Sequence, residues 1–507
     1  MAEAGYGKKL FRGSAVVFAA AAIAAVISYL LRLFLARNLS VADFGLLYSI
    51  LAFVGLFAIF KDIGLGSTLV KFIAEFSGSG KKEQIKSSIT AVGAIQIVSA
   101  FIFMVPIIIF SDAIAISYLK TPAAALPLQL IAVSFIIGTL MTLLQHAAQG
   151  LGHATIYAVV EPIRIAAAFA GSIALIYMGV AGVSYAYVIA AAVSVAFLFI
   201  SLRSKRTITG KALPEKKLLK ELMRFAIPVF IGGLSALLLF YTDTITITIF
   251  RGVEEVGLYN AALPTSQLLW IIVTALVAVL LPVISEMWAK KHTEHISNAL
   301  SLIAKFSFVI LIPLAMMMVA FAEDVIRLLF GEAYVGASTA LQILSINALF
   351  YTVFVIFSTS LISVNRPLTN TKITAVISVI NLVMDVALVP QYGIAAAALA
   401  TAVSYLIGAI LAYFALKKSV PITLDIKSLG KIAAGGLISL AVIFIIKTLL
   451  LSDIWLKIGL SLVISLGVYS VFVLYTKGVT KKELEYMKKL NMPVPKFMSR
   501  MVEKLSS

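Results

Sequence analysis

Residues 30–66, LLRLFLARNLSVADFGLLYSILAFVGLFAIFKDIGLG, contain two apolar runs joined by a short polar turn. The first run ends at Ala36, and the second begins at Phe44. Each run is close to the roughly 20 residues that an α-helix needs to cross a bilayer. The stretch therefore predicts a hairpin of two transmembrane helices.

Three charged residues lie inside these two apolar runs, namely Arg32 in the first and Lys61 and Asp62 in the second. A charge in the hydrocarbon core is costly and usually faces a cavity or a partner. Gly64 and Gly66 follow the charged pair, and glycines at such a place allow a helix to bend. The stretch is thus also a candidate polar pathway.

The composition extends this interpretation to the whole chain. Apolar residues make up 61% of the 507 residues, the charged fraction is 13%, and the mean hydropathy is +1.06. Soluble proteins average about 45–50% apolar residues, so the sequence predicts an all-α polytopic membrane protein. The absence of cysteine excludes disulfides, thiolate metal sites and cysteine nucleophiles. The basic N-terminus resembles a signal peptide, but its apolar run leads directly into further spans, which predicts an uncleaved first helix.

Apolar runs of spanning length recur along the chain and predict about fourteen transmembrane helices. They fall at about 14–36, 44–66, 88–110, 124–148, 154–178, 182–202, 225–250, 257–284, 299–321, 337–363, 367–389, 394–416, 430–451 and 455–475.

Alternate loops collect most of the positive charge. Roughly 30 of the 41 basic residues fall on one side, which is expected to be cytoplasmic and to hold both termini. The protein is accordingly expected in the cell membrane. The net charge of +18 then reflects topology and attraction to anionic lipid, and no nucleic-acid partner is expected.

The two halves of the chain resemble each other. KKLFRGSAVVF at 8–18 aligns with KELMRFAIPVF at 220–230, and GLLY at 45–48 falls near GLYN at 257–260. GVAGVSYAYVIAAAVS at 179–194 also aligns with GIAAAALATAVS at 393–404. An internal repeat of about six helices predicts two pseudo-twofold bundles with a transport site between them.

The expected domain order follows from this repeat. A first bundle covers 1–202, a basic cytoplasmic linker 203–224, a second bundle 225–416, and two additional helices 417–475. The basic tail 476–507 has an amphipathic pattern, which predicts a helix on the membrane surface, although a frayed solvated tail fits equally well.

Several further charged residues lie inside the predicted spans. Glu161 and Arg164 are three residues apart on one helix, the spacing of an internal ion pair, which is the simpler alternative to contact with a substrate. Lys61 and Asp62 are adjacent and point about 100° apart, so at least one of them needs another partner. Lys61 also has the alternative of extending toward the cytoplasmic interface.

Arg32 and Asp243 occupy nearly corresponding places in the two halves. They are expected to form an outward gate, or Arg32 alone to hold an anionic phosphate, because guanidinium matches phosphate geometry. A helix-end anchor is the structural alternative for Arg32. Asp385 lies close to an outer helix end, where an interfacial role is the simpler interpretation, and Lys305 lies near a cytoplasmic end, as does His146.

Metal and nucleotide sites are not expected. His292 and His295 form an HxxH pattern without further ligands nearby, and SGSGKK at 77–82 lacks the spacing of a phosphate-binding loop. Without an ATPase motif, active transport requires an ion gradient or the membrane potential. The expected cofactor set is empty, with Na+ or H+ as the possible coupling ion.

An ordered set of motifs resembles a known family. LARNLSVADFGLLYS, DIGLGSTLVKFIAE, YTDTITI (241–247), VGLYNAA (256–262), LPVISE (281–286), LFGEAY (329–334) and NLVMDVALVPQYGIAAAALATAVSY (381–405) follow each other across about twelve helices. Together they resemble the polysaccharide transporter branch of the multidrug/oligosaccharidyl-lipid/polysaccharide (MOP) flippase superfamily. Each motif is weak alone, and their order is specific to the family but not to a substrate.

The resemblance implies a flippase that moves an oligosaccharide on a polyprenyl (di)phosphate carrier from the cytoplasmic to the outer leaflet by alternating access. It implies cationic cavity residues, for which Arg32, Lys61, Arg164 and Lys305 are the candidates. It also implies ion-coupling or gating carboxylates, and the candidates here are Asp62, Asp243, Glu161 and Asp385. No enzyme activity is expected. The protein is expected to be a monomer in contact with membrane lipids.

Two rival functions belong to other classes. An ion-coupled exporter of cationic drugs shares the superfamily, but its site favours several cavity carboxylates, whereas basic and acidic candidates are mixed here. A membrane-embedded glycosyltransferase or polymerase needs acidic residues on large outer loops, and the outer loops here are short.

Overall fold

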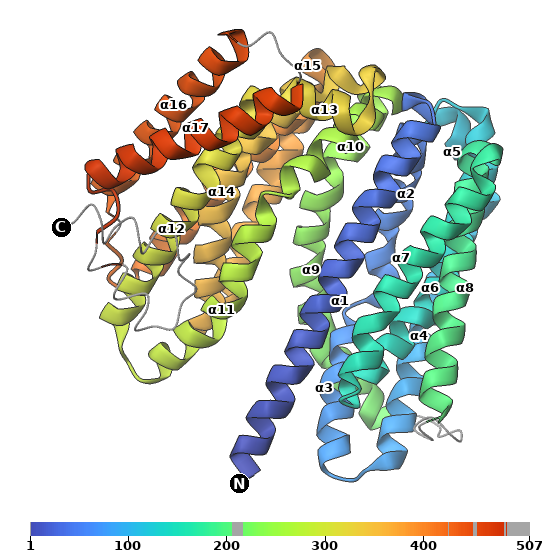
Figure 1. Ribbon diagram of the computed structural model, residues 1–507. Coiled ribbons are helices and arrows are strands. Elements are labelled where there is room, and N and C mark those ends of the chain that lie inside the picture. The colour runs from blue at the N-terminus through green and yellow to red at the C-terminus, as the bar shows by residue number, and fades with distance from the viewer. Residues whose placement is uncertain (1, 205–215, 424, 450–453, 481–482, 484–507) are drawn as a thin grey trace. The chain divides into compact units, whose positions relative to one another are not determined.

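The computed structural model describes residues 2–204, 216–423, 425–449, 454–480 and 483 (Figure 1). Every regular element within these ranges is a helix, so the chain is an all-α polytopic membrane protein. The described residues contain 11 helical stretches that are long and apolar enough to cross a bilayer. Two of these stretches, Ala154–Arg203 and Pro367–Lys417, each hold two helices in succession.

The first compact unit covers Met1–Asn260. α7 packs against α1 and α8, and α8 also packs against α6 (Figure 1). α2 and α3 pack beside α4 and α6. The helices are α1 (Ala2–Asn38), α2 (Val41–Asp62), α3 (Leu65–Gly78), α4 (Lys82–Ile109), α5 (Ser111–Ser117), α6 (Ala125–Gly150), α7 (Ala154–Leu175), α8 (Gly179–Ser204), α9 (Lys216–Phe250) and the beginning of α10 (Val253–Gln267), with 3-10 turns at Pro122–Ala124 and Ile176–Met178.

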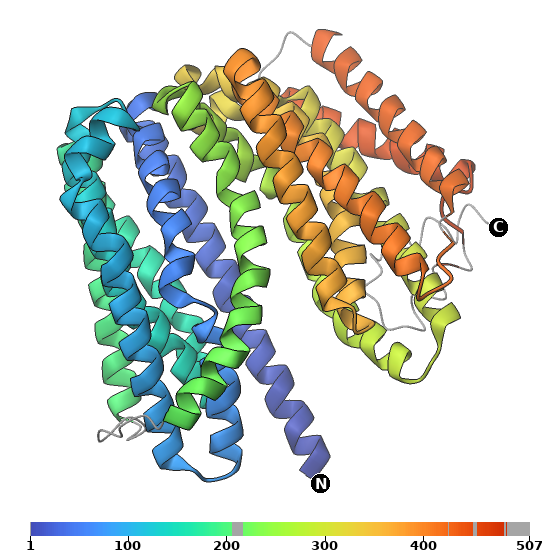
Figure 2. The ribbon, with the colours of Figure 1, turned by 180° about the vertical axis from the view of Figure 1, so that it is seen from behind.

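The expected linker is partly helical. α8 continues to Ser204 and α9 begins at Lys216, so the end of the segment 203–224 is the first part of a long helix. Residues 205–215 lie outside the described ranges. α9 packs along α2 and α3 (Figure 2), which is why the first compact unit extends to Asn260 rather than ending at 202. The repeat of two six-helix bundles is a statement about sequence and stays a prediction.

The expected bend after Asp62 is confirmed. α2 ends at Asp62, Ile63 and Gly64 adopt left-handed backbone angles with φ of 47° and 71°, and α3 starts at Leu65. Gly64 also makes a close approach to α9, because a Cβ at this position would lie 2.9 Å from the backbone N of Phe230. A larger residue at Gly64 would meet both backbone strain and this contact.

The second compact unit covers Ala261–Ser507. In the described part, α12, α14 and α15 form its centre, and α16 and α17 make a hairpin that packs on α12. The helices are α11 (Trp270–Ala289), α12 (Thr293–Ala320), α13 (Ala322–Phe330), α14 (Ser338–Ser363), α15 (Pro367–Lys417), α16 (Ile426–Leu449) and α17 (Ile454–Tyr475), with a 3-10 turn at Glu332–Ala337.

Helix boundaries explain the difference between 11 candidate stretches and the larger number expected. α15 merges two expected spans across a kink at Gly393, where φ is 59° and ψ is −142°. The expected span 257–284 is divided between α10 and α11. The expected end of the last span at Tyr475 agrees with α17, and the tail 484–507 lies outside the described ranges.

The α16–α17 hairpin is fastened to α12 and α13 by lysines at both of its ends. Lys447 of α16 donates to the Asp324 carboxylate at 2.6 Å and to the carbonyl of Ala320 at 3.0 Å. Lys305 of α12 makes the corresponding contacts at the opposite end, described below. These pairs join the two helices outside the repeat to the second unit.

Candidate functional site

Arg32 of α1 is half-buried in the first unit and is held by neutral partners. Its Nη1 donates to the backbone carbonyl of Asn260 at 2.8 Å, and its guanidinium lies 4.2 Å from the centroid of the Tyr48 ring. Among the residues that the structure describes, no ion pair of Arg32 is found. A cation–π contact and a carbonyl orient the guanidinium without neutralising it.

Asp243 of α9 and Arg32 of α1 both contact residues of α10. Asp243 is 5% exposed, and the Tyr259 hydroxyl of α10 donates to its Oδ2. Tyr259 directly precedes Asn260, whose carbonyl accepts from Arg32. The expected pair of opposite charges is therefore joined through two adjacent residues of α10.

The two similar motifs GLLY and GLYN meet in the first unit. A Cβ on Gly45 would overlap the carbonyl of Val253 and lie 2.6 Å from the backbone N of Gly257, and a Cβ on Gly257 would overlap the carbonyl of Val41. Only glycine permits this approach of α2 and α10. Nearby, Thr248 donates to Ser49 at 3.0 Å, which adds a polar contact between α9 and α2.

Glu161 and Arg164 form the expected internal pair on α7. Arg164 donates to both carboxylate oxygens, at 2.5 and 3.1 Å, and the two side chains are 39% and 30% exposed. Tyr187 of α8 lies in the electrostatic neighbourhood of Tyr48, Arg32 and Arg164. The two arginines thus share one region of the first unit, although Arg164 carries its own counter-ion.

The α2–α3 break holds a second polar cluster. Asp62 Oδ1 accepts from Gln96 Nε2 of α4 at 2.5 Å and from the backbone N–H of Gly66 at 3.1 Å. His146 of α6 lies within electrostatic range of Asp62 and against Gly66. Lys61 is in the last turn of α2, and its side chain lies outside the described part of the structure.

Lys305 is embedded in the second unit between two carboxylates. Its side chain is 2% exposed, and Nζ lies 2.7 Å from Glu483 Oε1 and 3.3 Å from Asp425 Oδ2. Hydrogen bonds from Ser428 lower the pKa of the Asp425 carboxyl, and the Lys305 ammonium lowers it further. These contacts support a structural role for Lys305 rather than the substrate contact expected from charge and depth.

Asp385 is completely buried in α15. One turn earlier, Asn381 is also fully buried, and its Nδ2 lies 3.4 Å from Thr401 Oγ1 on the other side of the Gly393 kink. A buried carboxylate one turn from a buried amide within a transmembrane helix suits an ion-coupling role.

No metal centre emerges from the described residues, within which no group of three or more His, Cys, Asp or Glu side chains gathers. The His292 and His295 rings lie 5.5 Å apart at the beginning of α12.

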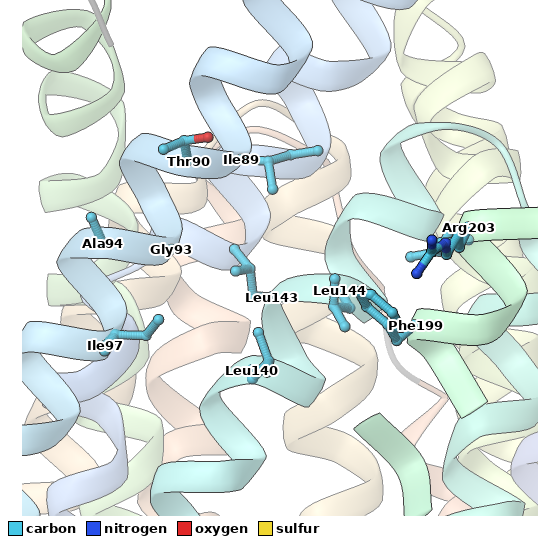
Figure 3. A pocket seen from close by; sticks show the side chains of 11 residues that line it. Ile89, Thr90, Gly93, Ala94, Ile97, Leu140, Leu143, Leu144, Phe199 and Arg203 are labelled. Atoms are coloured by element: carbon cyan, nitrogen blue, oxygen red, sulfur yellow. The ribbon is translucent and has the colours of Figure 1, made fainter. Parts of the chain in front are cut away.

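A separate groove of about 720 Å³ lies on α4, α6 and α8 (Figure 3). Its lining is mostly aliphatic, with Ile97, Leu140 and Phe199 among the labelled side chains and Arg203 beyond Phe199. Such a lining suits a hydrocarbon chain and offers few hydrogen bonds to a sugar. None of the candidate site residues is among the residues that line this groove.

Sequence reasoning missed the neutral members of both polar clusters. Tyr48, Tyr259 and Asn260 hold the two expected charges of the first cluster, and Gln96 holds Asp62 in the second. A single glutamine in the span 88–110 was a signal in principle, because an amide in hydrocarbon also requires a partner. The tyrosines gave no such signal, since aromatic residues are common at membrane interfaces.

Comparison with protein families gives two matches. The family model described as polysaccharide biosynthesis protein matches residues 10–288, and the MatE model matches residues 228–390.

Two archaeal relatives cover nearly the whole chain. An uncharacterised membrane protein of Methanocaldococcus jannaschii is 27% identical over 497 residues, covering 95% of this chain and 98% of its own. A probable low-salt glycan biosynthesis flippase of Haloferax volcanii, Agl15, is 24% identical over 467 residues, covering 92% and 96% of the two chains.

Solved structures show the same fold at low sequence identity. A lipid II flippase, MurJ, in an inward closed conformation has a TM-score of 0.74 at 17% identity and covers 90% of this chain and 98% of its own. An inward-facing multidrug resistance MATE family transporter has a TM-score of 0.67 at 16% identity, with 77% and 95% coverage.

Proposed function

The chain belongs to the polysaccharide biosynthesis protein family within the MOP flippase superfamily, and from this premise we propose that it is a flippase for a lipid-linked oligosaccharide. The substrate is an oligosaccharide on a polyprenyl (di)phosphate, moved from the cytoplasmic to the outer leaflet. The names of similar proteins support this class, since one is a probable glycan biosynthesis flippase and another a lipid II flippase.

The physical task of such a protein is to carry a charged head through hydrocarbon. A buried, unpaired charge costs several kcal/mol or more, so a phosphate and its sugars require replacement hydrogen bonds on the way. The prenyl chain remains in lipid and needs no such help. Rocking of helices around a polar site accomplishes this without covalent chemistry, and the protein is therefore not an enzyme.

The observation that carries the proposal is the state of Arg32. Its guanidinium is half-exposed, oriented by the Asn260 carbonyl and the Tyr48 ring, and retains its positive charge. A phosphate bound there gains charge-assisted hydrogen bonds worth about 1.5–3 kcal/mol each. Arg164 is a secondary candidate in the same region, because the Glu161 carboxylate already binds it.

The contact between α2 and α10 supplies the outward closure. Gly45 and Gly257 allow the helices to touch, and Arg32 binds the end of the same α10 segment through Asn260. A phosphate that competes for the Arg32 guanidinium weakens this attachment. Substrate binding is thereby linked to opening of the closure, with Asp243 and Tyr259 as its second attachment.

Transport is coupled to an ion gradient or to the membrane potential. Asp243 and Asp385 are buried carboxylates in spans, and Asp62 lies at a helix break. Each provides a place where a proton or Na+ can change the local charge. Glu161 is the weakest of the four candidates because Arg164 neutralises it.

An exporter of cationic drugs is the second candidate function. It is favoured by the MatE match at 228–390 and by the MATE transporter with a similar fold. A cationic drug would meet the guanidinium of Arg32 as a repulsive charge, which is why the flippase is preferred.

The cellular setting belongs to the proposal. The protein acts as a monomer in the cell membrane with both termini in the cytoplasm, and its basic loops contact anionic lipid rather than nucleic acid.

Transport by the purified full chain in proteoliposomes tests the proposal. A fluorescent polyprenyl-diphosphate oligosaccharide is offered under Na+ and pH gradients, and a cationic dye is offered in parallel. We expect flipping of the lipid and no dye export. Dye export without lipid flipping would establish the rival function.

A further inference from the structure

The α2–α3 break contains a polar cluster whose hydrogen bonds are incomplete. Gln96 is 1% exposed, and its Nε2 is committed to Asp62, but its Oε1 is buried without a partner in the described structure. His146 Nδ1 is likewise buried and lacks a hydrogen bond of normal geometry. Buried polar atoms of this kind are costly and require an explanation.

The cluster is organised around a discontinuity in a transmembrane helix. Asp62 is the last residue of α2, and its Oδ1 accepts from Gly66 in the first turn of α3. The carboxylate therefore lies between the negative end of one helix dipole and the positive end of another. Ser99 of α4 donates to the exposed carbonyl of Phe60 at 2.6 Å, which supports the broken end of α2 from the same side as Gln96.

Glycine at position 66 brings the imidazole to this carboxylate. A Cβ at Gly66 would lie 2.6 Å from His146 Nδ1, so His146 rests directly on the first turn of α3. His146 is four residues before the end of α6 at Gly150. That end is expected to face the cytoplasm, so the cluster is within reach of cytoplasmic protons.

We propose that Asp62, Gln96 and His146 form a proton-binding site that controls the angle between α2 and α3. The ionised Asp62 accepts from Gly66 and Gln96 and holds the break as observed. When Asp62 takes up a proton, it gains a hydroxyl donor and loses its attraction to the N-terminus of α3. His146 and the unpaired Gln96 Oε1 are the candidate acceptors for the new donor.

Other ionisable groups on the packed helices have surroundings of their own in the described structure. The Lys61 side chain is outside the described part of the structure. Lys71 lies 4.2 Å from the centre of the Phe225 ring, and Tyr241 rests on Gly55. Tyr187 neighbours Arg32 and Arg164, and Arg203 lines the groove. Lys82, Glu83 and Arg224 are exposed, and Lys86 is ten residues before Gln96.

The break transmits its angle to the helix that leads to the Arg32 site. Gly64 touches the backbone of α9 at Ala226 and Phe230. The next helix, α10, begins after α9 and carries Asn260, which binds Arg32. A change at the break therefore biases the same helices that hold the guanidinium. This coupling rests on the proposed flippase function, whereas proton binding itself does not.

The donor set favours a proton over Na+. Hard cations are bound by several oxygen ligands, whereas this cluster includes an imidazole nitrogen beside one carboxylate and one free amide oxygen, and the nearby Ser99 hydroxyl and Phe60 carbonyl bind each other. Imidazole and carboxylate side chains exchange protons readily in this kind of pair.

Infrared difference spectroscopy of the reconstituted full chain tests proton binding without any transport. On acidification we expect a protonated-carboxyl band that disappears in Asp62→Asn and shifts its midpoint in His146→Gln. Asp43→Asn is the matched control, because Asp43 lies at the opposite end of α2 and bonds to Ser40. Replacing Na+ by choline should leave the band unchanged.

The outcomes separate this proposal from the flippase proposal. A band that survives in Asp62→Asn, or a midpoint that depends on Na+, overturns the proton site. If Asp62→Asn does not fold, Gln96→Leu removes only the amide and should still shift the midpoint, and an unshifted midpoint rejects the site. If the wild type shows the band but flips no lipid, the proton site stands and the flippase function fails.

Transport then tests the coupling. In Asp62→Asn, we expect flipping to lose at least about tenfold of its stimulation by a pH gradient, while exchange without a gradient continues. Full stimulation in this variant would overturn the coupling role.

Discussion

Arg32 and Lys305 are both basic residues in apolar helices, but their surroundings are opposite. Arg32 is half-exposed and contacts a carbonyl and an aromatic ring, whereas Lys305 is 2% exposed and lies between Glu483 and Asp425. A cation with neutral partners can still attract an anionic ligand, whereas carboxylates on both sides of a cation already balance its charge. Charge and position in the sequence alone therefore do not predict the surroundings of a basic residue in a transmembrane helix.

The largest effect is expected for stability at Lys305. Lys305→Ala removes the buried ammonium that both carboxylates share and leaves a cavity in α12, which should cost about 2–4 kcal/mol of unfolding free energy because the carboxylates themselves are partly exposed. Thermal unfolding in detergent measures the loss. Lys290→Ala is the control, because its pair with Glu286 is exposed to solvent and should contribute little to stability. A fully stable Lys305→Ala that cannot flip lipid would reverse our comparison.

The glycine contact of α2 and α10 should be the next most sensitive position. Gly45→Ala forces a Cβ into the carbonyl of Val253, and such overpacking costs about 1–3 kcal/mol. We expect faster labelling by a membrane-impermeant thiol reagent at Ser49→Cys, since the chain has no native cysteine.

Gly78→Ala is the control for this closure, because nothing lies within 4 Å of the position of its Cβ. Equal labelling in both backgrounds would show that the α2–α10 contact does not close the outer side.

The Glu161–Arg164 pair separates structural from functional charge within the first unit. Because both side chains are about a third exposed, each single change to Gln should cost about 0.2–1 kcal/mol. The double variant should lose little more than either single variant, as a double-mutant cycle would reveal. If both single variants are stable and only Arg164→Gln abolishes flipping, Arg164 belongs with Arg32.

The smallest effect is a pH dependence at Asp425. Its pKa is lowered, first by Ser428 and then by Lys305, so the ionised form stabilises the fold above the unfolded pKa of about 3.9. This contribution is lost as the pH falls through the lower, folded pKa. The side chain is 45% exposed, which limits the effect to about 1 kcal/mol.

Thermal unfolding between pH 6 and pH 3 measures this dependence. The difference between wild type and Asp425→Asn should shrink as the pH falls. A difference that grows toward acidic pH would contradict the sign of the shift.

Local patterns predicted the helices well because the bilayer imposes a length and a composition on each span. The apolar run after Phe44 and the bend at Gly64 are both local features, and both are found. The merged helix α15 shows the limit, since a kink at Gly393 satisfies the backbone without a loop.

The partners of the charges were beyond the sequence because they depend on packing between distant segments. Lys305 meets residues 120 and 178 positions away, and Arg32 binds a carbonyl 228 positions away. The packing of α15 buries Asp385 completely, which counting residues along the helix does not reveal. The resemblance supplied the family, and the structure supplied the neighbours that separate Arg32 from Lys305.

Flipping of a fluorescent polyprenyl-diphosphate oligosaccharide by Arg32→Ala tests the central claim most directly. The rate is compared with wild type and Arg32→Lys in proteoliposomes, at matched amounts of folded protein. We predict a loss of roughly 10–100-fold in Arg32→Ala, from one or more charge-assisted hydrogen bonds, and partial activity in Arg32→Lys. Wild-type flipping by Arg32→Ala would contradict the claim that this guanidinium binds the substrate.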